Sequence, residues 1–284
     1  MTTLTTRKTR AYPAAKLPLS IAAVSSYLDT DLLGSTMAVL RSADSTNRYI
    51  KENISALDDG FTVIAEKQFA GRGRLGRTFA SPEGGLYMSI LLIGQNHIEN
   101  LDSMTVRAAV AVKNAIAEIS GLSGVGIKWV NDIYYNDKKL CGILAERVVR
   151  KGFCDFAVLG IGVNVTTPNK SFDPSIRDIA ASISDFCPVH FSRNELAASI
   201  LNHLEKTLFE KDKEKSAQIL DDYRASSVII GRKVYITNGE KTVIAEVLGI
   251  DDDASLYVRY DDGVTEIVRT GEVSTKLVNE EENK

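Results

Sequence analysis

The stretch Gly71-Arg72-Gly73-Arg74-Leu75-Gly76-Arg77 alternates three glycines with three arginines. It follows an apolar segment, residues 61–68, whose pattern predicts a strand. Glycine lets backbone N–H groups approach an anion closely, and arginine adds a planar set of charged donors that suits phosphate and carboxylate. The stretch therefore predicts a loop after a strand that holds an anionic ligand.

Three familiar phosphate-binding motifs do not fit this loop. The glycines match G-x-G-x-x-G, but a dinucleotide-binding loop opens a helix at its last glycine, and here Pro82 and Gly84 follow. A P-loop ends in Gly-Lys-Ser/Thr, whereas Gly76 is followed by Arg77. The H-R-D and D-F-G motifs of kinases are absent from the sequence. Taken alone, the loop is also compatible with a solvated basic surface loop.

Composition indicates an ordinary globular protein. The chain has 284 residues, 44% of them hydrophobic and 25% charged, with a formal net charge of −3. That length favours about two domains, and that charge does not favour a dedicated nucleic-acid-binding protein. No run approaches the roughly 18 apolar residues of a membrane span.

Cysteine and histidine positions imply neither a disulfide framework nor a zinc site. The three cysteines, Cys141, Cys154 and Cys187, are odd in number and lack paired spacing, which fits a reducing compartment and a cytoplasmic location. The three histidines do not cluster with them at zinc-ligand spacing. The first 28 residues contain no acid, and we interpret this start as a disordered leader, with a transit peptide as the alternative.

Periodicity predicts a mixture of helices and strands, followed by a small all-β domain. Helices are expected at residues 19–28, after 44–47, and at 103–119, 192–208 and 213–223. Strands are expected at residues 36–40, 61–68, 86–93, 125–130, 132–135, 140–149 and 155–165. After residue 227 the pattern changes to short strands at 233–236, 243–250, 256–260 and 266–268. This last pattern is typical of a small barrel.

Three further positions suggest chemistry. Asp44-Ser45-Thr46-Asn47 is a run of helix-capping residues, which either caps a helix and nothing more or also faces a ligand. Lys128 is a lone cation in an apolar strand, so it either lies at an exposed edge or needs a partner or ligand. Gly160 and Gly162 at the end of a strand indicate that another group approaches the backbone closely.

Taken in order along the chain, these motifs resemble the biotin–protein ligase (biotin–[acetyl-CoA-carboxylase] ligase) family over about residues 19–278. The resemblance rests on the capping run, on Gln68 with the glycine-arginine loop, and on three later motifs. These are Lys128-Trp129-Val130-Asn131-Asp132, Leu140-Cys141-Gly142-Ile143-Leu144-Ala145-Glu146 and Gly160-Ile161-Gly162-Val163-Asn164.

The resemblance implies an α+β fold. Its catalytic domain would have a mixed central β-sheet flanked by helices, as in the class II synthetase-like biotin/lipoate ligases, followed by a small SH3-like β-barrel. The expected divisions are a disordered leader at 1–18, a catalytic biotin- and ATP-binding domain at 19–226, and the barrel at 227–284.

The resemblance also implies an enzyme that activates biotin with ATP as biotinyl-5′-AMP and transfers it to a lysine of a biotin carboxyl carrier domain. Catalysis would rest on Lys128, Arg74 and Arg72. The biotin-binding residues would be Ser45, Thr46, Asn47, Gln68, Gly71, Arg72, Gly73, Arg74, Lys128 and Gly142. The ATP-binding residues would be Arg72, Arg77, Phe79, Lys128, Asn131 and Asn164. Mg²⁺ would accompany ATP without a dedicated protein cage, with Asp132 as a contributor.

The sequence departs from the family pattern at three places. Val130 stands where the family usually has proline, and Phe79 stands where many members have a tryptophan near the adenine. Fewer than 20 residues precede the first matching helix, so we expect no DNA-binding domain and no DNA binding. The expected partners are the carrier domain of acetyl-CoA carboxylase or a related carboxylase and a second copy of the chain, with no membrane. The alternatives are a lipoate or octanoate ligase and a non-catalytic biotin-binding regulator.

Overall fold

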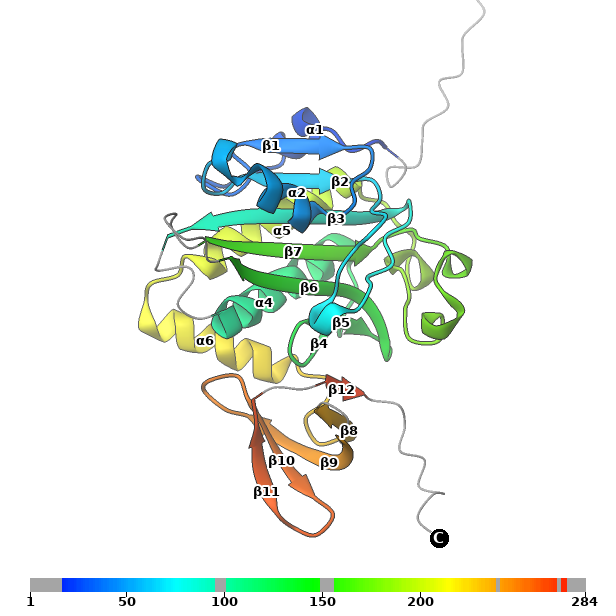
Figure 1. The fold of residues 1–284 in the computed structure, drawn as a ribbon, viewed down its shortest axis with the longest axis vertical. Coiled ribbons are helices and arrows are strands. Elements are labelled where there is room, and N and C mark those ends of the chain that lie inside the picture. Colours follow the sequence, from blue (N-terminus) through cyan, green and yellow to red (C-terminus); the bar gives the residue numbers. More distant parts are fainter. Residues whose placement is uncertain (1–16, 95–100, 149–155, 239–240, 270–271, 275–284) are drawn as a thin grey trace, which may run out of the picture.

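The computed structural model describes residues 17–94, 101–148, 156–238, 241–269 and 272–274. Seven strands form the central sheet in the order β1-β2-β3-β7-β6-β5-β4 (Figure 1). The pair β1–β2 is parallel and the other pairs are antiparallel, so the sheet is mixed, as expected. In sheet order the strands are Met37–Leu40, Thr62–Ala65, Gly85–Ile93, Phe156–Asn164, Lys138–Val148, Asp132–Tyr135 and Gly126–Lys128.

Helices cover the two faces of the sheet unequally. Helices α4 (Leu101–Ser120) and α5 (Arg193–Leu208) lie behind the sheet in Figure 1, α6 (Lys213–Ala225) lies below it next to α4, and α2 (Thr46–Asn53) lies in front. Helix α1 (Ile21–Ser25) lies near the β1 edge. Short 3-10 turns occupy Ile54–Ala56, Arg74–Gly76, Asn169–Ser171, Pro174–Ile176 and Ile183–Asp185.

Alternation along the strands divides the packing between these faces. On β3, Met88 and Ile90 belong to the large core cluster that also contains α4 and α5 residues. Leu91 points to the other face and packs with Ile50 of α2. Helix α2 covers only part of that front face, so the rest of the face is left for the loops that follow β2 and β4.

The C-terminal domain is a five-stranded antiparallel sheet in the order β11-β10-β9-β8-β12. Its strands are β8 (Lys233–Asn238), β9 (Lys241–Ile250), β10 (Leu256–Tyr260), β11 (Thr265–Val268) and β12 (Glu272–Ser274). Strand β12 was not among the predicted strands. The sheet contacts the catalytic domain through Arg224 of α6, whose Nε donates to the carbonyl of Ile250 at 2.8 Å.

The predicted helices and strands are confirmed, with differences at their ends. Strand β2 ends at Ala65 instead of residue 68, and β4 ends at Lys128 instead of residue 130. A turn joins β5 and β6, where Asn136 and Asp137 have φ values of 47° and 57°. The division at residues 226 and 227 stays a prediction.

The expected disordered leader lies largely outside the described residues, which begin at Leu17. The carbonyls of Leu17 and Pro18 accept hydrogen bonds from Arg193 and Asn194 of α5, at 3.4 and 3.0 Å. Cys154 also lies outside the described residues. Among the helices that the structure describes, none has the length and apolar character needed to cross a bilayer.

Candidate active site

A cavity of about 710 Å³ opens beside α2, on the part of the front face of the central sheet that this helix does not cover. Its walls come from the start of α2, the glycine-arginine loop, β4 to β7 and, from the C-terminal domain, Arg232, Thr237 and Val273. The structure brings nearly all the predicted site residues together here. Those that line the cavity are Ser45, Thr46, Asn47, Gln68, Arg72, Gly73, Arg74, Arg77, Phe79, Lys128, Asn131, Asp132, Gly142 and Asn164.

Gly71 is the one predicted site residue that does not line the cavity. A Cβ atom at this position would lie 2.4 Å from the carbonyl oxygen of Phe79 and 2.6 Å from Ser81 Oγ. Only glycine fits between these groups without a shift of the backbone. Gly71 therefore fixes the base of the loop, and its predicted contact with biotin stays a prediction.

The glycine-arginine loop forms a narrow hairpin over the sheet. Phe79 N donates to the carbonyl of Gly71 at 2.9 Å, and Gly73 N donates to that of Arg77 at 2.8 Å. At the tip, Leu75 has φ 52° and is 74% exposed. Arg74 reaches across the cavity, and its Nη1 lies 3.5 Å from Asn131 Oδ1. This long hydrogen bond links the loop to the opposite wall of the cavity.

The neutral pole of the cavity consists of Ser45, Thr46, Asn47 and Gln68. Ser45 caps α2, with its side chain accepting from Arg48 N at 3.5 Å, and Thr46 and Asn47 form the first turn. All three are at most 5% exposed, although their side chains are polar. The run therefore caps the helix and also lines the cavity, and its contact with a ligand stays a prediction.

The cationic pole is formed by Lys128 with Arg72 and Arg74 of the loop. Lys128 ends β4, an outer strand of the sheet, but it lines the cavity. Its Nζ lies 3.4 Å from the hydroxyl of Tyr134 and 5.1 Å from the centre of that ring. Burial, followed by the nearby carboxylates of Asp132 and Asp137, raises the pKa of the Tyr134 hydroxyl, so this partner is neutral at physiological pH. The peptide bond after the adjacent Trp129 is cis.

Phe79 packs on a pair of glycines between the two poles. Gly142 of β6 and Gly162 of β7 are directly paired across the strands. A Cβ atom on Gly162 would lie 2.5 Å from Phe79 Cε1, and one on Gly142 would lie 3.0 Å from Cε2. The close approach predicted at the Gly160–Gly162 motif is therefore made by the Phe79 ring and, at Gly160, by the Asn47 amide. Lys139 Nζ lies 5.7 Å from the centre of the Phe79 ring, so a cation as well as the two glycines neighbours this ring.

Two buried oxygen atoms of the cavity have no hydrogen-bond partner, Asp132 Oδ1 and Asn164 Oδ1. Asp132 Oδ1 lies 2.8 Å from Lys139 Nζ, which is an ion pair without hydrogen-bond alignment. Asn164 Nδ2 donates to the carbonyl of Ala181 at 3.2 Å, so its oxygen is the end left available. Among the described residues, no three His, Cys, Asp or Glu side chains gather into a metal site. One carboxylate oxygen fits a magnesium ion that arrives on nucleotide phosphates, not one held by the protein alone.

Sequence reasoning missed several residues of this site. Glu146 stands in a quoted motif but received no role, and it accepts from Asn47 Nδ2 at 2.8 Å. Ser89 of β3 hydrogen-bonds with Thr46 and Asn47. A serine between the apolar residues Met88 and Ile90 was a signal in the sequence that could have marked it. Lys139 and Arg232 also line the cavity, and nothing local in the sequence marks them.

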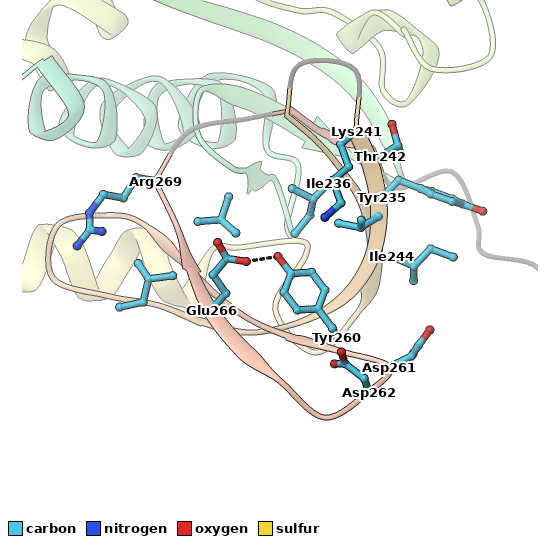
Figure 2. A pocket seen from close by; sticks show the side chains of 13 residues that line it. Tyr235, Ile236, Lys241, Thr242, Ile244, Tyr260, Asp261, Asp262, Glu266 and Arg269 are labelled. Atoms are coloured by element: carbon cyan, nitrogen blue, oxygen red, sulfur yellow. Dashed lines mark hydrogen bonds between the residues drawn. The ribbon is translucent and has the colours of Figure 1, made fainter.

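A second hollow of about 980 Å³ lies on the C-terminal sheet, as Figure 2 shows. Tyr260 donates its hydroxyl to Glu266 Oε2 at 2.5 Å inside it, and the rim carries charges of both signs (Figure 2). None of the predicted site residues lines this hollow. The chemistry that the sequence predicts is therefore concentrated in the first cavity.

Comparison with known proteins agrees with this geometry. Residues 39–164 match the Biotin/lipoate A/B protein ligase family. The bifunctional ligase/repressor BirA of Bacillus subtilis is 31% identical over 244 residues, which are 84% of this chain and 74% of that protein. The biotin–[acetyl-CoA-carboxylase] ligase of Mycobacterium tuberculosis is 32% identical over 222 residues, covering 76% of this chain and 79% of that one.

Among solved structures, the biotin protein ligase from Aquifex aeolicus in complex with biotin and ATP superimposes with a TM-score of 0.73. It is 27% identical and covers 84% of this chain and 98% of that chain. The fold and the site thus define a ligase of the mixed-sheet class. The chain belongs to the biotin–protein ligase family. The predicted fold class and the prediction of a ligase enzyme are confirmed.

Proposed function

We propose that this protein joins biotin to a lysine of a carboxyl carrier domain in two steps. In the first, the biotin carboxylate attacks the α-phosphorus of ATP, forming biotinyl-5′-AMP and releasing pyrophosphate. In the second, the amine of the carrier lysine attacks the acyl carbon, forming an amide and releasing AMP. We further propose the carrier domain of acetyl-CoA carboxylase or a related carboxylase as acceptor, and the cytoplasm as location.

The observation that carries this proposal is the polarity of one cavity. One pole offers neutral hydrogen-bonding groups, Ser45, Thr46, Asn47 and Gln68, and the other offers the cations Arg72, Arg74 and Lys128. Biotin has the matching form, because a neutral cyclic urea stands at one end and a carboxylate at the other. The cationic pole then also receives the α-phosphate, so both anionic reactants meet there.

Lys128 is the proposed centre of the first step. Carboxylate and phosphate repel each other, and negative charge builds on the phosphoryl oxygens as the leaving group departs. A fixed cation that contacts both anions lowers that cost most where the charge develops. Lys128 is suited to this because it lies at the cavity wall, where its Nζ is 3.4 Å from the hydroxyl of Tyr134.

Phe79, Asn131 and Asn164 are the proposed nucleotide contacts. The Phe79 ring on the Gly142–Gly162 floor offers a stacking face to adenine. Asn164 Oδ1 is a buried acceptor without a partner, which an N–H donor of the ligand would satisfy. Asn131 donates its Nδ2 to the carbonyl of Ile143 at 2.6 Å, so its own oxygen faces Arg74 and the cavity.

Asp132 is the proposed protein contact for Mg²⁺ on the ATP phosphates. The bound ion would supply neutralisation of the leaving pyrophosphate. Lys139 at 2.8 Å balances the Asp132 carboxylate.

A homodimer is also proposed, and among the described residues the outer strands of the central sheet are β1 and β4.

The experiment that tests this function is pyrophosphate release by the purified chain with Mg²⁺ and ATP, comparing biotin, lipoate and octanoate. Release with biotin alone, followed by transfer to a carrier domain, supports the proposal. Release only with lipoate or octanoate would assign the chain to the sister acyl-ligase activity. Tight biotin binding without release would identify a regulator that has lost turnover.

A further inference from the structure

A chain of hydrogen bonds runs from the neutral pole into the sheet. Thr46 Oγ1 and Ser89 Oγ lie 2.7 Å apart, and Ser89 Oγ lies 2.5 Å from Asn47 Oδ1. Asn47 Nδ2 then donates to Glu146 Oε2 at 2.8 Å. The first three residues are at most 5% exposed, so their hydrogen bonds are made within the protein. This series of hydrogen bonds ends at its only charged member, Glu146 of β6.

Glu146 is held ionised by its surroundings. Its Oε1 lies 2.7 Å from Lys51 Nζ of α2. Partial burial alone would raise the pKa of Glu146, but the hydrogen bonds from Asn47 and Lys51 and the charges of Lys51 and Arg72 outweigh it, and the pKa is lowered. An ionised carboxylate has no hydrogen to give, so Glu146 only accepts.

This fixed acceptor determines the direction of every hydrogen bond in the series from Glu146 to Thr46. Asn47 must turn its NH₂ group to Glu146, and its oxygen therefore faces Ser89. Ser89 has one hydrogen, which it gives to that oxygen. The 2.7 Å contact between Ser89 and Thr46 then needs the hydroxyl hydrogen of Thr46. Thr46 is left with its oxygen lone pairs open towards its other neighbours.

Gln68 is oriented in the same sense from the opposite side. Ser81 donates its hydroxyl to the carbonyl of Phe79 at 3.0 Å, so it accepts from Gln68 Nε2, at 2.8 Å. Gln68 Oε1 consequently faces Thr46, whose backbone N–H it accepts at 2.8 Å. Thr46 Oγ1 could also donate to Gln68 Oε1, 3.1 Å away, but its single hydrogen goes to Ser89 because that contact is shorter, at 2.7 Å. Two acceptors thus stand together at the cavity wall and suit an N–H donor on a ligand.

We infer that Glu146, supported by Lys51, is a positioning residue that makes the neutral pole an acceptor for the N–H groups of a cyclic urea. This inference rests on the proposed function, because biotin is the ligand whose urea ring it would orient. Glu146 acts through Asn47 and Ser89 and contacts no reacting atom.

Replacing the carboxylate by an amide reverses the chain. In Glu146→Gln the new NH₂ group avoids the ammonium of Lys51 and turns to Asn47. Asn47 then presents its oxygen to this group and its own NH₂ to Ser89. Ser89 gives its hydrogen to Thr46, whose hydroxyl hydrogen now faces Gln68 and blocks the ligand N–H. The change removes one hydrogen bond to the ligand and sets two donors against each other.

The test measures biotin binding by calorimetry, and the KM values for biotin and ATP, on the 284-residue protein. We expect Glu146→Gln to weaken biotin binding about 10-fold or more, with the KM for ATP unchanged. The matched control is Glu246→Gln in the exposed Glu246–Arg259 pair of the C-terminal sheet, which leaves both values unchanged. Glu146→Asp keeps an acceptor-only carboxylate and stays within about threefold of the wild type.

A double-variant cycle with Ser89→Ala separates action through the chain from any other effect. Ser89→Ala cuts the chain, so adding Glu146→Gln to it should cost little more. Losses that multiply in the double variant would overturn the inference, as would unchanged binding in Glu146→Gln. If Glu146→Gln does not fold, Glu146→Asp decides, because a 10-fold loss there contradicts a role that needs only an acceptor. Failure of the wild-type protein to bind biotin would overturn the proposed function itself. The variants test only the role of Glu146.

Discussion

The indole Nε1 of Trp129 donates a hydrogen bond of 2.7 Å to the backbone carbonyl of Ala254 in the C-terminal domain. Ala254 stands in the turn before β10 with φ 66°, and the carboxylate of Asp251 accepts from Ser255 N at 2.9 Å to shape that turn. Trp129 is the residue after Lys128. The small β-sheet therefore contacts the segment that carries the proposed catalytic cation.

Trp129→Phe should destabilise the protein and slow adenylate formation. Phenylalanine keeps most of the apolar packing but leaves the buried carbonyl of Ala254 without its donor, at a cost of about 1–3 kcal/mol. Urea unfolding followed by circular dichroism measures that loss, and pyrophosphate release measures the rate. Tyr257→Phe on β10, where the tyrosine is 41% exposed, is the control and should change neither value. Unchanged stability in Trp129→Phe would show that this hydrogen bond contributes nothing to the contact.

Lys128→Met should nearly abolish adenylate formation while the fold is kept. Removing one charged group that stabilises a transition state typically costs about 10²–10³ in rate. Methionine retains the packing of the lysine stem against Tyr134. Lys215→Met in α6, where the lysine side chain is 73% exposed, provides the matched control with the same exchange. Near-normal pyrophosphate release by a folded Lys128→Met protein would remove Lys128 from the mechanism.

Local sequence predicted the elements of the fold because each has a clear period or cap. The capping run before α2, the Asn136-Asp137 turn and the apolar strand β7 are local signals, and the structure has each of them. The end of β2 was placed too late, because beyond Ala65 the pairing continues only as an isolated parallel bridge between Ala43 and Gln68. Strand β12 has three residues, too few for a periodic pattern to be recognised.

The site was predictable where the family motifs mark it, and less so where distant segments meet. Glu146 and Asn47 are 99 residues apart, and Trp129 and Ala254 are 125 apart. Their contacts depend on the register of β6 against α2 and on the docking of one sheet on the other. No spacing within a single segment encodes either relationship. Residues that act through others were therefore missed, while nearly all the predicted site residues line the cavity.

Arg74→Ala should release the adenylate intermediate from the site. Arg74 is the loop residue that spans the cavity to Asn131, and its loss removes the described tie of the loop tip to the opposite wall. A loop that no longer closes exposes the acyl-adenylate to water and to other amines. We expect free biotinyl-5′-AMP in the filtrate and biotin on bystander proteins. Arg259→Ala on β10, with a half-exposed arginine, is the control. Full retention of the intermediate by Arg74→Ala would contradict the role of the loop as a lid.

Gly162→Ala should raise the KM for ATP more than the KM for biotin. The added methyl group would lie 2.5 Å from Phe79 Cε1, so the ring must leave the glycine floor on which we propose that adenine stacks. Stacking on an aromatic ring contributes about 0.5–1.5 kcal/mol beyond its buried area, so a several-fold rise is expected. Gly249→Ala on β9 is the matched control, because its added methyl group meets no atom within 4 Å. A larger rise in the KM for biotin than for ATP would place Phe79 against the acyl group, and equal rises would mean that the floor supports the whole cavity.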